Sequence, residues 1–190
     1  MVVEIPYQLR QWTVEEYHRL AEIGVFDPQE RVELLDGQII LMSTKGTAYA
    51  CANRRADKRF RQLLGDRVEV CIQDPVQLSD RAEPEPDIAI VKRDRFEYAN
   101  RHPNPSDVLL IVEIADTTLK YDREIKAIAY ARAGIGEYWI LDVVDRRLLV
   151  FRQPTPNGYQ QQTIVSETES PTLLQFPNAT IAVSQLLPPI

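Results

Sequence analysis

The sequence is poor in cysteine, and this shortage argues against two kinds of structure. Only two cysteines occur among the 190 residues, Cys51 and Cys71, with no Cys-X-X-Cys pair and no histidine cluster beside them. A disulfide framework and a structural zinc site are therefore not expected. We expect both thiols to be buried or to have no chemical role.

Long hydrophobic runs are also missing. No segment reaches the roughly 18 consecutive apolar residues that a membrane helix needs, although hydrophobic residues make up 44% of the chain and charged residues 26%, as in ordinary globular proteins. The N-terminal stretch MVVEIPYQLRQW has no basic region followed by a long apolar one. We therefore expect no signal peptide, no membrane partner and a cytoplasmic protein.

The chain lacks an overall positive charge. Its net charge of −6 counts against a nucleic-acid partner, since phosphate binding usually requires a basic surface. Locally, however, residues 53–61 contain five basic residues and one acid. The spacing of Ala52, Ala56, Phe60 and Leu63 predicts a helix over 47–64 with one apolar face. The other side carries Arg54, Arg55, Lys58 and Arg61, which form either a solvated helix face or a basic patch that contacts nucleic acid.

Patterns elsewhere predict a mixed order of helices and strands. A helix over 13–24 begins with a capping box of Thr13 and Glu16, and Asp36-Gly37 marks a hairpin within 31–43. A second helix spans 121–134, and a polar loop spans 92–107. Further strands are expected at 67–78, 86–91, 108–115, 136–142, 146–153 and 159–165. This order indicates a mixed α/β or α+β fold in which helices flank a central sheet.

Two carboxylates stand out by position. Asp87 opens an apolar strand after a proline, and Glu113 interrupts the apolar run of another strand 26 residues later. A buried, unpaired carboxylate costs several kcal/mol or more. If the two strands are neighbours, both acids converge at one edge of the sheet, where oxygen ligands would hold Mg²⁺ or Mn²⁺. Lys126 on the following helix is the other natural partner of Glu113.

Each of these residues also has a structural interpretation. Asp87 would, in this interpretation, form a hydrogen bond with a turn at the start of its strand. Glu113 would form an ion pair with an arginine. Lys126 fits a surface pair with Asp122, four residues earlier.

Several segments in order carry a resemblance to a known family. They are RVELLDGQIILMS, PEPDIAIV, VEIADTTLKYDREIK and AGIGEYWILD. Together they resemble the Uma-two family of the PD-(D/E)XK restriction-endonuclease-like superfamily, from about residue 31 to residue 151. The resemblance implies a nuclease fold in which an aspartate, a second acid and a lysine cleave DNA with a divalent metal, Mg²⁺ or Mn²⁺.

The superfamily signature can be carried over residue by residue. Asp87 matches its aspartate and Glu113 its second acid, while Glu33 matches an upstream acid that adds a metal ligand in many such nucleases. The lysine expected two residues after the second acid is replaced by Ala115. The matching lysine is then Lys126, with Lys120 as the less favoured alternative.

Other positions also depart from the family pattern. A proline usually follows the serine of the segment MSTKGTAYA, and a histidine usually occurs near position 49 or 50, where this chain has Tyr49 and Ala50. The segment VEIADTT also replaces the family's more usual Leu-Ser-Pro-Ser-Thr.

The resemblance implies one restriction-endonuclease-like domain over 1–190. Its parts are an N-terminal helix and hairpin at about 12–42, a core at about 46–152 and C-terminal strands at about 158–190. We expect a metal-dependent endonuclease that acts on DNA, and a homodimer by resemblance only. A nuclease-like module that binds or assembles without cleaving, and a hydrolase acting on another phosphate ester, are the alternatives.

Overall fold

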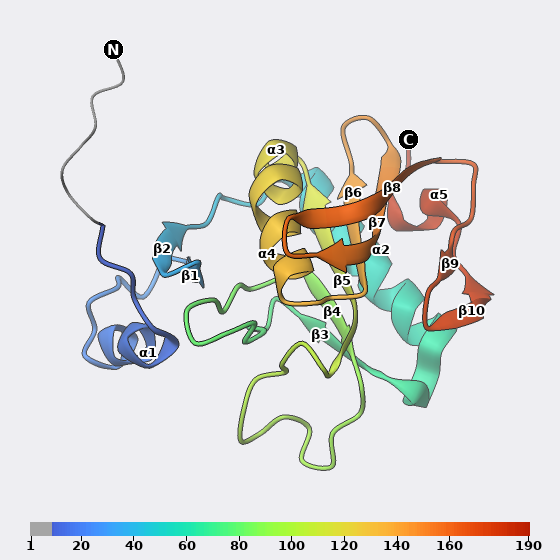
Figure 1. The fold of residues 1–190 in the computed structure, drawn as a ribbon. Coiled ribbons are helices and arrows are strands. Elements are labelled where there is room, and N and C mark those ends of the chain that lie inside the picture. Colours follow the sequence, from blue (N-terminus) through green and yellow to red (C-terminus); the bar gives the residue numbers. More distant parts are fainter. Residues whose placement is uncertain (1–8) are drawn as a thin grey trace.

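The computed structural model describes residues 9–190 (Figure 1). Residues 1–8 belong to the stretch for which we expect no signal peptide, and they lie outside the described residues. No helix in the described part of the chain is both long and apolar enough to span a membrane.

A six-stranded sheet forms the centre of the molecule, with strand order β3-β4-β5-β6-β7-β8. Neighbouring strands are antiparallel except β5 and β6, which are parallel and are joined by a helical crossover. The strands are β3 (Glu69–Ile72), β4 (Ile88–Val91), β5 (Val108–Ala115), β6 (Glu137–Asp142), β7 (Arg147–Thr155) and β8 (Gly158–Ser166). The predicted fold class, a mixed sheet flanked by helices, is confirmed.

Helices cover both faces of this sheet (Figure 1). On one face α2 (Thr47–Leu64) and α5 (Val183–Leu186) pack over the side chains of the central strands. On the other face lie α3 (Leu119–Tyr121), the π-helical turn η2 (Asp122–Lys126) and α4 (Ala127–Arg132). Trp139 and Tyr138 on β6 are fully buried on opposite faces, as expected for core residues.

The N-terminal elements lie beside the sheet. Helix α1 (Val14–Glu22) begins with the predicted capping box of Thr13 and Glu16. The hairpin of β1 (Val32–Leu35) and β2 (Gln38–Leu41) turns at Asp36-Gly37, where both residues have positive φ as the Asp-Gly signal predicts. A Cβ on Gly37 would come within 2.7 Å of the Cβ of Gln11, so no larger residue fits this turn without movement.

Strand β3 and the helix predicted from 121 differ from the sequence prediction in their bounds. Strand β3 ends at Ile72 and not near 78, because Gln73 takes a positive φ and Pro75 follows. The helix predicted from 121 begins at Leu119, and its second turn is π-helical. After β8 the chain forms the short strands β9 (Thr172–Leu173) and β10 (Phe176–Thr180) before α5. A short 3₁₀ turn, η1 (Gly65–Arg67), follows α2.

Both cysteines are free thiols, and both are half-buried. Burial raises the pKa of Cys71 to about 11, so this thiol stays protonated at neutral pH.

Candidate active site

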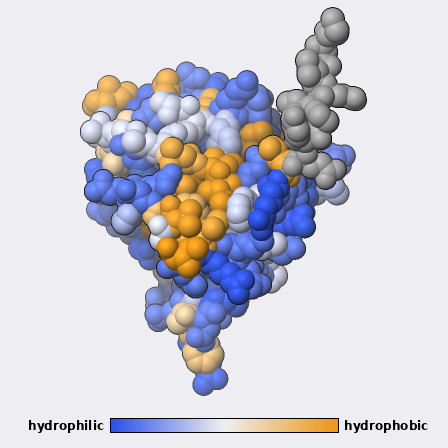
Figure 2. All heavy atoms as spheres, turned by 90° about the vertical axis from the view of Figure 1, so that its left-hand side faces the viewer, coloured by the Kyte–Doolittle hydropathy of each residue, from blue (hydrophilic) through white to orange (hydrophobic). Residues whose placement is uncertain are grey.

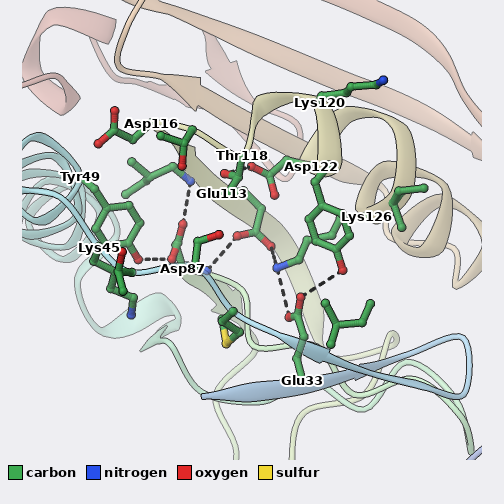
Figure 3. A pocket seen from close by; sticks show the side chains of 18 of the residues that line it. Glu33, Lys45, Tyr49, Asp87, Glu113, Asp116, Thr118, Lys120, Asp122 and Lys126 are labelled. Atoms are coloured by element: carbon green, nitrogen blue, oxygen red, sulfur yellow. Dashed lines mark hydrogen bonds and ion pairs between the residues drawn. The ribbon is translucent and has the colours of Figure 1, made fainter. Parts of the chain in front are cut away.

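Four predicted site residues from four parts of the chain line one cavity of about 620 Å³ (Figure 3). Glu33 comes from β1, Asp87 from the residue before β4, Glu113 from β5 and Lys126 from the end of η2. All four side chains are buried. The structure therefore brings the four residues into one pocket, while their chemical roles stay predictions.

Lys126 lies between two of the acids. Its Nζ is 3.1 Å from Oε1 of Glu113 and 3.1 Å from Oε2 of Glu33. Only 5% of its side chain is exposed, so the ammonium group depends on these carboxylates for the interactions that water would otherwise supply. The partner of the buried Glu113 is thus a lysine and not an arginine.

The π-helical turn brings two helix residues onto the same oxygen. The N–H of Ala127 bonds to the carbonyl of Asp122, five residues back, which marks the wider turn. Tyr130, one turn after Lys126, donates a 2.8 Å hydrogen bond to Oε1 of Glu113, the oxygen that Lys126 also contacts. That oxygen is therefore fully engaged, and Oε2 is the freer oxygen of Glu113.

Asp87 is bound to the neighbouring strand by backbone geometry. Because β4 pairs antiparallel with β5, Asp87 stands beside Glu113. The N–H of Ile114 donates to Oδ2 of Asp87 at 2.8 Å, and the N–H of Asp87 faces Oε2 of Glu113 at 3.3 Å. The two carboxylates that the sequence places 26 residues apart are thus direct neighbours.

The hydroxyl of Tyr49 completes the surroundings of Asp87. Tyr49, in the first turn of α2, donates to Oδ1 of Asp87 and accepts a 2.6 Å hydrogen bond from the side chain of Gln73. In the sequence, Tyr49 stood out only because the family usually has a histidine near this position. Its nearness to Asp87 is a contact across 38 residues, which no local pattern predicts.

Both oxygens of Glu33 have protein partners. Oε2 contacts Lys126 and accepts from the N–H of Glu85 at 3.1 Å, while Oε1 faces the hydroxyl of Tyr121 at 3.4 Å. This arrangement fits a group that holds Lys126 in place. Its predicted role as a third metal ligand stays a prediction.

A surplus of acids over bases controls the protonation of the site. Burial raises the pKa of Asp87, and it raises the pKa of Glu113 well above its usual range. Burial also raises the pKa of Asp122 to about 6. Burial opposes the charge of Lys126, but the carboxylates of Glu113 and Glu33 outweigh this effect and raise its pKa. Lys126 therefore carries a positive charge at neutral pH. This single charge does not balance the several acids around it.

Not every predicted residue lies at the cavity. Lys120 reaches its edge but points away from the acids and is 85% exposed, paired at 3.9 Å with Glu124 (Figure 3). The four basic residues of α2 do not line the cavity, because they come after the first turn of the helix. Arg55 and Arg61 donate hydrogen bonds to the backbone carbonyls of Ser184 and Val70. The predicted role of Arg54, Arg55, Lys58 and Arg61 in nucleic-acid binding stays a prediction.

One wall of the cavity is apolar. Figure 2 shows apolar side chains gathered on the face that carries the N-terminal hairpin. Among the cavity-lining residues, Leu41 is 66% exposed and Ile125 is 48% exposed. On the polar side Lys45 lines the same cavity, and burial together with the nearby Arg31 lowers its pKa.

The donor atoms of this cavity suit a hard divalent cation. Asp87 and Glu113 present adjacent carboxylates whose raised pKa values show that further positive charge would stabilise the ionised forms. Carboxylate oxygens are the ligands that Mg²⁺ and Mn²⁺ prefer. The residues present therefore fit the metal that the family resemblance implies, with Asp87 and Glu113 as the ligands.

A family model and a solved structure are similar to this chain. The model of the Uma2 family, described as "Putative restriction endonuclease", matches residues 14–184. The chain belongs to the Uma2 family. A crystal structure described as a putative nuclease belonging to DUF820 from Anabaena variabilis ATCC 29413 has the same fold, with a TM-score of 0.72 over 92% of this chain and 96% of that chain. Its sequence is 14% identical, so this likeness concerns the fold alone.

A search of curated proteins gives no match to this Uma2 chain. Within the Uma2 assignment, the nuclease-like sheet is the part of the prediction that both the family and the fold support.

Proposed function

We propose that this Uma2 protein is a divalent-metal-dependent endonuclease that hydrolyses phosphodiester bonds of DNA. The observation that carries the proposal is the bonded series Lys126, Glu113 and Asp87 along one wall of the cavity. Family membership supports a nuclease, and the paired carboxylates support a metal-assisted hydrolysis.

Asp87 and Glu113 would hold Mg²⁺ or Mn²⁺, Asp87 through its carboxylate and Glu113 through Oε2. When bound, such an ion polarises a phosphate oxygen and lowers the pKa of the attacking water. The N–H of Ile114 keeps the Asp87 carboxylate in its orientation, and Tyr130 keeps that of Glu113. Because these hydrogen bonds already fix both acids, little reorganisation would accompany ion binding.

Lys126 would act as a fixed positive charge. Its raised pKa keeps the ammonium protonated, so it serves as a hydrogen-bond donor and not as a general base. From its position beside Glu113 it would orient the attacking water or stabilise the negative charge that develops on the phosphate. Glu33 would hold this ammonium in position.

DNA would approach from the open side of the cavity. Lys45 and Lys120 line this side and are suited to contact the flanking phosphates. The basic residues of α2 would add contacts only if the substrate extends around that helix. The family resemblance adds a homodimer, since superfamily nucleases that cut both strands commonly pair their active sites.

The proposal is tested by cleavage of duplex DNA, single-stranded DNA, RNA and small phosphodiesters with Mg²⁺ or Mn²⁺. Asp87→Asn and Glu113→Gln should each reduce cleavage by at least about 100-fold, since one ligand is lost in each. Glu124→Gln is the matched control, because Glu124 is 59% exposed at the cavity edge. Unchanged cleavage by both site variants would contradict the assignment, and activity confined to small phosphodiesters would favour a different hydrolase.

A second candidate is a binding module that does not cleave. It is favoured by one observation: Tyr49, Lys126 and Tyr130 already satisfy oxygens of both acids. Calorimetry with Mn²⁺ separates the two candidates, because the enzyme requires binding that disappears in Asp87→Asn, whereas the module requires none.

A further inference from the structure

A second cluster of metal-binding side chains lies outside the cavity. His18, Glu83 and His102 each offer one ligand atom, and these atoms all lie within 4.8 Å of one another. His18 and His102 are the two histidines of the sequence. None of the three lines the cavity that contains Asp87 and Glu113.

The three residues come from separate segments. His18 is on α1, Glu83 lies in the segment between β3 and β4, and His102 lies in the loop between β4 and β5. Backbone hydrogen bonds bring these segments together: the N–H of Val14 donates to Asp80 at 2.8 Å, and that of Gln77 to Pro103 at 2.9 Å. In Figure 1 the green segment before β4 accordingly runs next to α1.

Glu83 is buried with only one of its oxygens paired. Its side chain is 2% exposed, and Oε1 lies 2.6 Å from Nε2 of His18. Oε2 is buried and has no hydrogen-bond partner among residues 9–190. A buried carboxylate oxygen without a donor is costly, so a cation at this point would offset an existing penalty.

The three ligand atoms are close enough together to share one transition-metal ion. Tetrahedral Zn²⁺ with ligand bonds of roughly 2.1 Å places ligand atoms about 3.4 Å apart, within the range of the observed cluster. Two imidazoles and one carboxylate form a common ligand set for this ion, with water in the fourth position. The cysteine shortage argued against structural zinc, but this cluster needs no cysteine.

We propose that His18, Glu83 and His102 form a binding site for Zn²⁺ or a chemically similar divalent transition-metal ion. The bound ion fastens α1 and the loop between β4 and β5 to the segment that carries Glu83. Glu83 also donates its N–H to the carbonyl of Leu34 on β1, next to Glu33. The site would therefore also anchor the segment that is hydrogen-bonded to β1 of the hairpin.

The test is a titration of untagged, metal-stripped protein with Co²⁺, followed by its visible absorption, and with Zn²⁺, followed by calorimetry. The wild type and Asp87→Asn should bind one ion with the same affinity at the histidine site. His102→Gln and His18→Gln should each weaken this binding at least about 100-fold, since each removes one ligand. Glu83→Gln should do the same. Glu97→Gln, which removes an equal charge from an exposed position of the loop between β4 and β5 that also carries His102, should not.

Folding of each variant is checked by circular dichroism, and the two histidine variants alter side chains that are not buried. Zn²⁺ should raise the melting temperature of the wild type and leave that of His102→Gln unchanged. Binding by the wild type within threefold of the double variant His18→Gln/His102→Gln would overturn the proposal. Binding that is lost in Asp87→Asn and kept in His102→Gln would overturn it too, because the ion would then occupy the other site.

Discussion

The hydroxyl of Tyr49 donates a hydrogen bond to Oδ1 of Asp87. This bond lowers the pKa of Asp87, which burial raises. Tyr49 therefore helps to keep a buried acid ionised, so that it can bind a cation. A histidine, which the family usually has near this position, would be suited to the same role.

Tyr49→Phe should accordingly move the onset of Mn²⁺ binding to higher pH. Without the phenol donor, burial dominates and the pKa of Asp87 rises further, so a proton competes with the ion over a wider range. Calorimetric titrations from pH 5 to pH 8 measure the shift. Tyr98→Phe, a change of the same kind outside the cavity, serves as control, and equal onsets in both variants would show that the Tyr49 bond has no such effect.

Lys126→Met should destabilise the metal-free protein by about 3 to 5 kcal/mol at neutral pH, because it leaves Glu33 and Glu113 buried without their cation. The loss should shrink toward pH 4.5, because burial raises the pKa of Glu113 well above its usual range and this acid then takes up a proton. Urea unfolding at the two pH values measures this difference. A loss independent of pH would indicate that packing, and not charge, is the cause.

Asp122→Asn should weaken the pH dependence of stability between about pH 4 and pH 6.5. Burial raises the pKa of Asp122 from 3.8 in its ordinary state to about 6 in the folded chain. The folded state then binds more protons than the unfolded state in this window, so this group makes stability fall as pH rises.

The variant lacks this contribution, so over the same window its free energy of unfolding should fall by about 2 to 3 kcal/mol less than that of the wild type. Urea unfolding in the presence of EDTA measures it, with Asp145→Asn at an exposed position as control. Parallel curves for wild type and Asp122→Asn would contradict the prediction.

A lysine at position 115 should partly replace Lys126. Side chains two residues apart on a strand share a face, so a lysine at 115 extends along the same face as Glu113. We expect Lys126→Ala to abolish cleavage and Ala115→Lys/Lys126→Ala to restore a measurable fraction. The cleavage rates of the single and the double variant are compared in the presence of Mn²⁺. Ala115→Met/Lys126→Ala is the control for packing. No gain over the single variant would show that the amine is required in its helical position.

The sequence predicted those parts of the fold that depend on local pattern. The Asp-Gly hairpin, the helix over 47–64 and the strand over 108–115 match the structure because turn chemistry and periodicity act within a few residues. The sequence brought Asp87 and Glu113 together only on the condition that their strands are neighbours, and the antiparallel pairing of β4 and β5 meets that condition.

Contacts between distant segments were beyond that reasoning. Tyr49 meets Asp87, and His18 meets Glu83, only because tertiary packing brings separate elements together. The bond from Tyr130 to Glu113 likewise depends on how the helix packs against β5. Buried titratable side chains on an otherwise apolar helix face were the available signal.

The π-helical turn has a consequence for comparing relatives of this chain. A helix turns about 100° per residue, so a relative with one residue fewer within Asp122–Lys126 would close an ordinary α-helical turn there. Its lysine would then occupy a different column of a sequence alignment while reaching the same carboxylate in space. For a relative that lacks a lysine at the aligned position, the neighbouring column is therefore the place to look for it, and a comparison of site residues by column alone would miss such a lysine.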